Sequence, residues 1–298
     1  MSPGRRDAGG QGGRRAGGRS AGGPRASAGR RAGPAYPGQR RSPGRSAPAT
    51  GLGGEQVEGR RAVEELLAAR SRGVRDVWVA QGSDPSPVLD RIVDLAGARR
   101  IPVQWMARAR LDAEARTEAH QGVIAHAEAL HEYDLDDVLA GPQGRPAFLV
   151  ILEGVTDPHN LGAVLRSAEC AGATGVVLPR HSSARITPTV AKAAAGAIEH
   201  LRVATVPGIP GALATLAKAG VWSVGLDAAA PRAVWGLEVA DRPVALVMGS
   251  EGKGLSRLAR ARCDLLVSIP QSGSVASLNV SAAAAVACFE VARARQGS

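Results

Sequence analysis

Side chains that could bind an anion or a polar substrate occur in three short segments in the second half of the chain. The first segment, DPHNLGAVLRSAECAG (157–172), opens on an Asp-Pro pair, which is typical of a helix start. Asn160 lies in the first turn and Arg166 in the second. Gly162 and Ala163 are small, so we expect the Arg166 guanidinium to reach back towards the helix start, where anions are favoured. The alternative is an ordinary capped helix with a surface arginine.

The second segment, VMGSEGKGLSR (247–257), leaves a β-rich run at Gly249 and carries Glu251 between further glycines. Bare backbone at glycine lets a ligand approach main-chain amides closely. The spacing is neither that of a phosphate-binding P-loop nor G-x-G-x-x-G, so a Rossmann dinucleotide site is not supported. A plain turn between a strand and a helix is the alternative.

The third segment, IPQSGSVASLNVS (269–281), passes from an apolar strand through a polar turn into a helix that is almost all alanine. Ser277 and Asn279 flank Leu278 at the helix entrance. These polar groups predict either a ligand site or a simple helix cap, for which Ser277 is the candidate. One face of the helix combines small and apolar residues, which predicts close packing with a neighbouring helix: Leu278, Ala282, Ala285, Phe289 and Ala292.

Residues 147–298 alternate short apolar runs with helical patterns, which predicts an α/β unit on a parallel sheet covered on both faces. The expected strands are AFLVILEGV from residue 147 and the runs at 176–179, 201–206, 221–226, 244–249 and 265–270. Each of the three polar segments begins at the end of one such strand. Because ligands of parallel sheets bind beyond the carboxyl ends of the strands, we expect a small-molecule site where these segments meet.

Residues 55–130 are expected to form a smaller α/β unit. Its expected elements are helices at 58–73 and 87–100 and strands at 74–80, 101–106 and 122–130. Residues 131–146 are acidic and then rich in Gly and Pro, which predicts a linker between the two units.

The first 54 residues have an unusual composition. They contain eleven Arg, no Lys and one Asp, and therefore carry +10, the formal charge of the whole chain. They also hold 16 of the 38 Gly and 6 of the 19 Pro, and so lack the apolar surface that would offset the entropy of ordering them. We predict a disordered basic tail. It either tethers a polyanion such as RNA through counterion release or is a solubilising leader without a specific partner.

Several classes of protein are disfavoured by the composition. No apolar segment near Met1 predicts a signal peptide, and no apolar run of about 18 residues predicts a membrane span, so a cytoplasmic protein is expected. Cys170, Cys263 and Cys288 form no C-x-x-C pair, and the six His show no ligand spacing, so no metal is assigned. Eight aromatic residues argue against a surface that reads bases by stacking.

The three polar segments, in this order and spacing, resemble the three motifs of the SpoU/TrmH branch of the SPOUT RNA methyltransferases over about 147–298. Residues 55–130, with GRRAVEELL near their start, resemble that branch's N-terminal RNA-binding domain. The two-domain layout is most similar to bacterial 23S rRNA (guanosine-2′-O-)-methyltransferases. The resemblance implies a C-terminal domain threaded into a deep trefoil knot, a homodimer formed through that domain, and S-adenosylmethionine as cofactor.

The resemblance also implies cofactor contacts, largely through main-chain groups, at Gly249, Ile269 and Leu278. It implies a catalytic set of Asn160, Arg166, Glu251, Ser277 and Asn279. Because arginine normally stays protonated, we expect Arg166 to hold an RNA phosphate and stabilise the forming alkoxide, with the proton leaving through phosphate or water. Asn160 would orient Arg166 or the ribose, and Glu251 would fix the cationic groups. Ser277 and Asn279 would shape the floor of the site.

Three functions remain open at this point. The first is S-adenosylmethionine-dependent 2′-O-methylation of a guanosine in 23S rRNA, and the second is the same chemistry on tRNA. The N-terminal unit favours rRNA, since tRNA members of this branch usually rely on short terminal extensions. The third is a non-catalytic RNA-binding factor of ribosome assembly, which the retained polar residues of the three motifs argue against.

Overall fold

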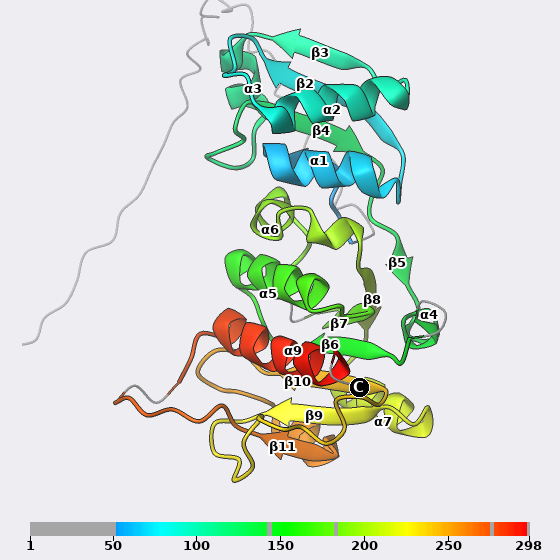
Figure 1. Cartoon of the computed structure of the whole chain (residues 1–298), viewed down its shortest axis with the longest axis vertical. Coiled ribbons are helices and arrows are strands. Elements are labelled where there is room, and N and C mark those ends of the chain that lie inside the picture. The colour runs from blue at the N-terminus through cyan, green and yellow to red at the C-terminus, as the bar shows by residue number, and fades with distance from the viewer. Residues whose placement is uncertain (1–51, 142–144, 182–183, 275–276, 297–298) are drawn as a thin grey trace, which may run out of the picture. The chain divides into compact units, whose positions relative to one another are not determined.

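The computed structural model describes residues 52–141, 145–181, 184–274 and 277–296, and Figure 1 shows its helices and strands. All but the last three residues of the predicted basic tail therefore lie outside the described residues. The described chain contains one sheet of four strands and one of seven. Each sheet has helices on both faces, so the predicted α/β class is confirmed.

The four-stranded sheet has the order β1-β4-β2-β3 and mixes parallel and antiparallel pairs. Its strands are β1 (Gln56–Glu58), β2 (Val74–Ala80), β3 (Val103–Met106) and β4 (Val123–Ala127). One face packs against the long helices α1 (Arg60–Ala69) and α2 (Pro87–Ala98), and the other against α3 (Arg108–Glu114). The two predicted helices are present. β1 and α3 escape sequence analysis because such short segments show no clear period.

The seven-stranded sheet is parallel throughout, in the order β11-β9-β10-β6-β7-β8-β5. Its strands are β5 (Glu132–Tyr133), β6 (Phe148–Leu152), β7 (Gly175–Pro179), β8 (Arg202–Val206), β9 (Trp222–Leu226), β10 (Val244–Met248) and β11 (Leu265–Val267). β6 and β10 are buried at every position, as the continuous apolar runs of their sequences predict.

Two layers of helices complete this unit. The core on one face includes α5 (Pro158–Cys170), α6 (Pro188–Ala193), the 3-10 helix η1 (Ala197–Glu199) and α9 (Val280–Gln296). The core on the other face includes α4 (Leu135–Ala140), α7 (Ile209–Lys218) and α8 (Arg257–Arg262). The neighbouring strands β6 and β10 thus lead into helices on opposite faces. This is the switch point at which parallel sheets open a crevice for ligands.

The segment 131–146 differs from the linker that its composition predicts. β5 pairs with β8 at the edge of the large sheet, and Val138 of α4 is buried against Gly175 of β7. The acidic residues have a local explanation, since Asp134 and Asp137 form a capping box at the start of α4. Residues 142–144 lie outside the described part of the chain.

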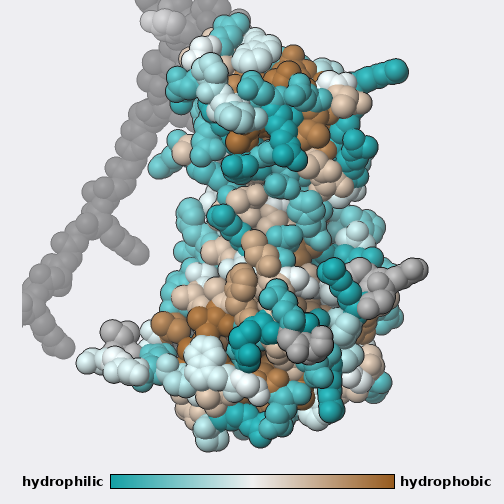
Figure 2. All heavy atoms as spheres, viewed as in Figure 1, coloured by the Kyte–Doolittle hydropathy of each residue, from teal (hydrophilic) through white to brown (hydrophobic). Residues whose placement is uncertain are grey.

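Apolar side chains reach the surface in several places. Figure 2 shows hydrophobic patches among hydrophilic residues, one of them in the region that α9 occupies in Figure 1. On α9, Phe289 is 51% exposed, and Leu278 just before the helix is 43% exposed. The helix face predicted to pack against a neighbour is therefore only partly covered within the described chain. No described helix has the length and apolar character needed to span a membrane.

Candidate functional site

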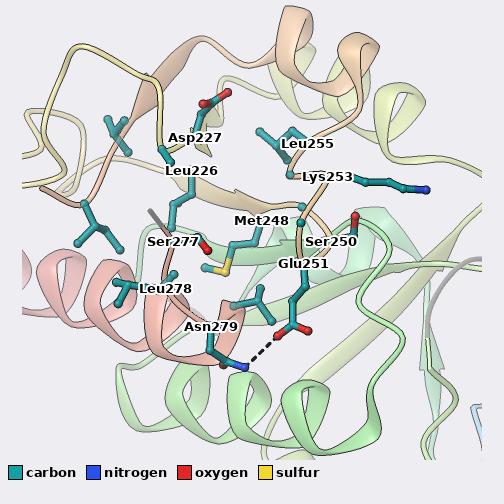
Figure 3. A pocket seen from close by; sticks show the side chains of 18 of the residues that line it. Leu226, Asp227, Met248, Ser250, Glu251, Lys253, Leu255, Ser277, Leu278 and Asn279 are labelled. Carbon is teal, nitrogen blue, oxygen red and sulfur yellow. Dashed lines mark hydrogen bonds between the residues drawn. The ribbon is translucent and has the colours of Figure 1, made fainter. Parts of the chain in front are cut away.

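A cavity of about 510 Å³ opens at the carboxyl ends of three neighbouring strands, β9, β10 and β11 (Figure 3). Leu226 ends β9 and Asp227 follows it, Met248 ends β10 and residues 249–255 follow it, and Ile269 lies two residues after β11. Residues 277–280, at the entrance to α9, line the cavity as well. The second and third polar segments of the sequence thus meet beyond the carboxyl ends of the strands, as predicted, on the β9 side of the β6/β10 switch point; no residue of the first segment lines the cavity. We call this space the strand-end cavity.

The loop after β10 is a tight turn that requires glycine. Ser250 and Gly254 exchange two backbone hydrogen bonds, with N···O distances of 3.1 and 2.9 Å. A Cβ atom on Gly249 would lie 1.9 Å from the carbonyl carbon of Gly254, so a side chain at Gly249 would push the two halves of the turn apart. Gly252 has φ of +77°, in the left-handed region that favours glycine. The turn leaves bare backbone along the cavity.

Three polar side chains from the three sequence segments form a hydrogen-bonded triangle beside the cavity. Asn160 Nδ2 donates to Glu251 Oε1 at 2.7 Å, and Asn279 Nδ2 donates to the same oxygen at 2.9 Å. Asn279 Nδ2 also lies 3.0 Å from Asn160 Oδ1, as a second donor contact. Figure 3 shows the Glu251 carboxylate directed towards Asn279. Glu251 therefore fixes two amides, where the sequence analysis expected it to fix cationic groups.

The two helices that supply the asparagines are capped by side chains. Asp157 accepts hydrogen bonds from the backbone N–H of His159 and Asn160, so the predicted start of α5 is confirmed. At α9 the cap is Asn279, whose Oδ1 accepts from Ser281 N at 2.8 Å. Capping by Ser277 is therefore the wrong alternative, because Asn279 directly precedes the first helical residue. Ser277 lines the cavity instead.

Arg166 and Ser277 are the two predicted catalytic residues that lie outside the triangle, and unlike Ser277, Arg166 does not line the cavity either. Its side chain is exposed and makes no hydrogen bond or ion pair to the described residues of the triangle. It lies six positions after Asn160, so the two side chains point about 120° apart around the helix axis. The space over Gly162 is also not clear, because a Cβ atom there would lie 2.4 Å from Ala193 Cβ of α6. The predicted path of Arg166 over Gly162 is therefore wrong.

The cofactor-binding prediction concerns three residues, and all of them line the strand-end cavity: Gly249, Ile269 and Leu278. Sequence analysis missed Asp227 and Arg260, which also line it and pair with each other at 3.0 Å. Asp227 directly follows a strand that was predicted, so the rule about strand ends could have identified it.

The chemical character of the cavity suits a small organic ligand. Apolar side chains such as Leu226, Ile269 and Leu278 alternate with main-chain groups and a small number of polar side chains, which is the usual composition of cofactor sites. Cys263 packs behind the cavity wall near Gly225 and Leu255, and burial raises the pKa of its thiol to about 12. It is therefore a neutral packing group. Among the described residues, no group of His, Cys, Asp and Glu is arranged to hold a metal ion.

Comparison with known proteins agrees with this geometry. The family model described as SpoU rRNA Methylase family matches residues 147–289, and that described as RNA 2'-O ribose methyltransferase substrate binding matches residues 56–133. Two relatives are 41% identical to this chain over more than 80% of its length and more than 95% of their own. The chain belongs to the SpoU rRNA methylase family. The resemblance drawn from the three sequence motifs is thereby confirmed, and the deep knot stays a prediction.

Two similar proteins are 23S rRNA (guanosine-2′-O-)-methyltransferases named RlmB. The one from Haemophilus influenzae is 41% identical over 82% of this chain and 99% of its own. The one from Pseudomonas aeruginosa is 41% identical over 81% of this chain and 97% of its own. Among solved structures, the SpoU methyltransferase AviRb from Streptomyces viridochromogenes in complex with AdoMet has a TM-score of 0.67 and 26% identity, covering 82% of this chain and 91% of its own.

Proposed function

We propose that this protein transfers a methyl group from S-adenosylmethionine to the ribose 2′-hydroxyl of a guanosine in 23S rRNA. The observation that carries the proposal is the triangle of Asn160, Glu251 and Asn279, which unites all three sequence motifs beside one cavity. Relatives about 40% identical over nearly their full length are named for this reaction. We place the reaction in the cytoplasm, where rRNA is processed in bacteria.

The strand-end cavity is the proposed cofactor site. Main-chain groups around Gly249, Ile269 and Leu278 would recognise adenine and ribose. Because Gly249 has no Cβ, the turn from Gly249 to Gly254 can close tightly and form one wall of the cavity. S-adenosylmethionine, when bound, supplies a methyl group activated by a sulfonium centre. The protein's own contribution is to hold the acceptor hydroxyl in line with that group.

The triangle is the proposed positioning device. Glu251 accepts from both asparagines, so each amide has a fixed orientation at the edge of the cavity. Asn160 Oδ1 and the second N–H groups of the amides can then orient the ribose. Ser277 is exposed, lines the cavity and would form part of the floor of the site. These groups supply alignment rather than acid–base chemistry.

Arg166 is the proposed phosphate-binding residue. Its exposed guanidinium lies on the same helix as Asn160 but outside the triangle, so it can bind an RNA phosphate and stabilise the forming alkoxide without entering the cavity. Phosphate or water would take the hydroxyl proton, because the guanidinium stays protonated.

Replacing Arg166 by Ala tests this role. We expect methylation of in vitro transcribed 23S rRNA to fall by roughly 10²–10³-fold, the range seen when one charge-stabilising donor is removed. Calorimetric affinity for S-adenosylmethionine should be unchanged. The matched control is Arg180→Ala, which removes another exposed arginine at the end of β7. Full activity of the Arg166→Ala protein would remove this residue from the mechanism.

A tRNA substrate is the second candidate. It is favoured by one relative, named a putative TrmH family tRNA/rRNA methyltransferase YacO from Bacillus subtilis, which is 38% identical over 81% of this chain. Mapping methylated riboses by primer extension in RNA from a deletion strain separates the two. Loss of a mark from tRNA with rRNA unchanged would replace the rRNA assignment.

We further propose that the protein works as a homodimer formed through its C-terminal domain. The support is the exposure of Phe289 on the face of α9 that carries small residues, and of Leu278 just before that helix. A monomeric mass in light scattering at assay concentration would contradict this.

A further inference from the structure

A second cavity, of about 440 Å³, lies in the N-terminal unit near the starts of α1 and α2. Three arginines and three other residues line it: Arg60, Arg61 and Arg108, with Ser86, Val88 and Gln121. We call it the arginine pocket. It shares no lining residue with the strand-end cavity.

Arg60 is held in place by the protein. Its Nη1 donates to Ser86 Oγ at 2.8 Å and its Nε donates to the carbonyl oxygen of Gln121 at 3.2 Å. Its backbone N–H donates to Gln121 Oε1 at 3.1 Å. Among the described residues, Nη2 has no protein acceptor. The guanidinium is therefore pre-oriented, with donor capacity left for a ligand.

Arg61 and Arg108 are the more adaptable cations of the pocket. Arg61 Nη1 pairs with Glu64 at 2.9 Å, and the Arg61 side chain is 67% exposed whereas that of Glu64 is 6% exposed. Nε and Nη2 of Arg61 donate to no described residue, so donor groups on its exposed side are left for a ligand. Glu64 also pairs with Arg91 at 3.3 Å, so its charge is shared. Arg108 is exposed and has neither a hydrogen bond nor an ion pair from its side chain to the described residues. The pocket thus carries positive charge that the described protein does not neutralise.

The geometry points to an anion with several acceptor oxygens. Guanidinium groups bind phosphate oxygens through two parallel hydrogen bonds, and α1 adds the positive end of a ten-residue helix whose N-cap, Gly59, has no side chain and whose first N–H donates to Gln121 Oε1. No aromatic side chain lines the pocket, so it offers nothing for base stacking. We propose that the arginine pocket binds a backbone phosphate of the RNA substrate. The inference rests on the proposed function, and assigns to these residues positioning of the RNA rather than reading of its sequence.

The test compares two double variants of the full-length chain. Arg61→Ala with Arg108→Ala removes two pocket cations, and Arg91 remains as the partner of Glu64. Arg75→Ala with Arg91→Ala removes two exposed arginines of the same unit that do not line the pocket. Steady-state methylation of in vitro transcribed 23S rRNA is measured at several salt concentrations, and S-adenosylmethionine binding is measured by calorimetry.

We expect the pocket variant to raise KM for rRNA about tenfold while kcat and cofactor affinity stay within about twofold of the wild type. The slope of log(kcat/KM) against log[salt] should become shallower by about 1, as expected for loss of a phosphate contact. The control pair should change KM and slope less. Equal KM and salt slope in the two double variants would overturn the proposal.

The design separates this inference from the proposed function. If the wild-type protein methylates rRNA but the pocket variant behaves as the control, the pocket inference alone fails. If the wild type methylates no rRNA, the proposed function fails first. Should the double variant lose cooperative thermal unfolding, Arg108→Gln alone provides the same comparison, because this side chain holds no described part of the structure together. An unchanged KM in that single variant would also count against the pocket.

Discussion

The strand-end cavity and the arginine pocket are lined by different kinds of chemical group. The former is formed by backbone turns after three parallel strands, with apolar side chains and amides whose orientation is fixed by Glu251. The latter is formed by long cationic side chains near the starts of two helices. A fixed, nearly neutral wall suits a small ligand that must be held in one conformation. Cations, two of them exposed, suit a polymer whose charge matters more than its shape.

The largest effect is expected from a substitution that closes the strand-end cavity and leaves the arginine pocket intact. Gly249→Val would place atoms where Gly254 lies, since even a Cβ would be 1.9 Å from the Gly254 carbonyl carbon. Overpacking of this kind costs about 1–3 kcal/mol, which would weaken S-adenosylmethionine binding by up to about a hundredfold. Calorimetry measures the affinity, and methyl transfer should fall at least in parallel.

The matched control for this substitution is Gly211→Val, at an exposed position of α7 where an added Cβ meets no atom within 4 Å. The salt dependence of RNA binding should be the same for Gly249→Val, the control and the wild type. Equal cofactor affinity in Gly249→Val and the control would mean that the cofactor does not bind against this turn.

A smaller effect is expected where the strand-end cavity meets its substrate. Glu251→Ala removes the oxygen that accepts from both Asn160 and Asn279. Two hydrogen bonds of ~1 kcal/mol each correspond to a decrease in kcat of about thirtyfold, with cofactor affinity changed far less. Glu251→Gln keeps an acceptor oxygen and should recover part of the rate. If both variants were equally impaired, the charge of Glu251 would matter more than its positioning role.

The two cavities also differ in how far a sequence can reveal them. The Asp157-Pro158 helix start and the buried run of β6 follow from local chemistry, so both were predictable. The triangle was predictable only through the resemblance, because its members are separated by 91 and 28 positions in the chain. A local rule favoured Ser277 as a cap, yet Asn279 has the backbone position that capping requires.

The residues of the arginine pocket could not be selected from the sequence. The chain contains 37 Lys and Arg residues, so composition cannot select the few that gather around one space. Arg108 lies 48 positions from Arg60, on a helix too short to show a period. Only the packing of the four-stranded sheet brings the two into one lining. The predicted path of Arg166 was wrong for a related reason. The period of the helix can be read from the local sequence, but the packing of α6 over Gly162 is a tertiary contact.

The smallest expected effect concerns α9, which borders the strand-end cavity but does not contribute to the arginine pocket. Hydrogen bonds from Arg293 and from Gly236 N–H lower the pKa of Glu290. Its stabilising contribution is therefore complete above the ordinary carboxyl pKa of about 4.3 and is lost as pH falls through the lowered folded-state value. Glu290→Gln should reduce the melting temperature near pH 7 by about 2–4 °C. Thermal unfolding between pH 7 and 3 should show this difference shrinking towards acid, and a difference independent of pH would mean that the carboxylate charge does not hold α9 in place.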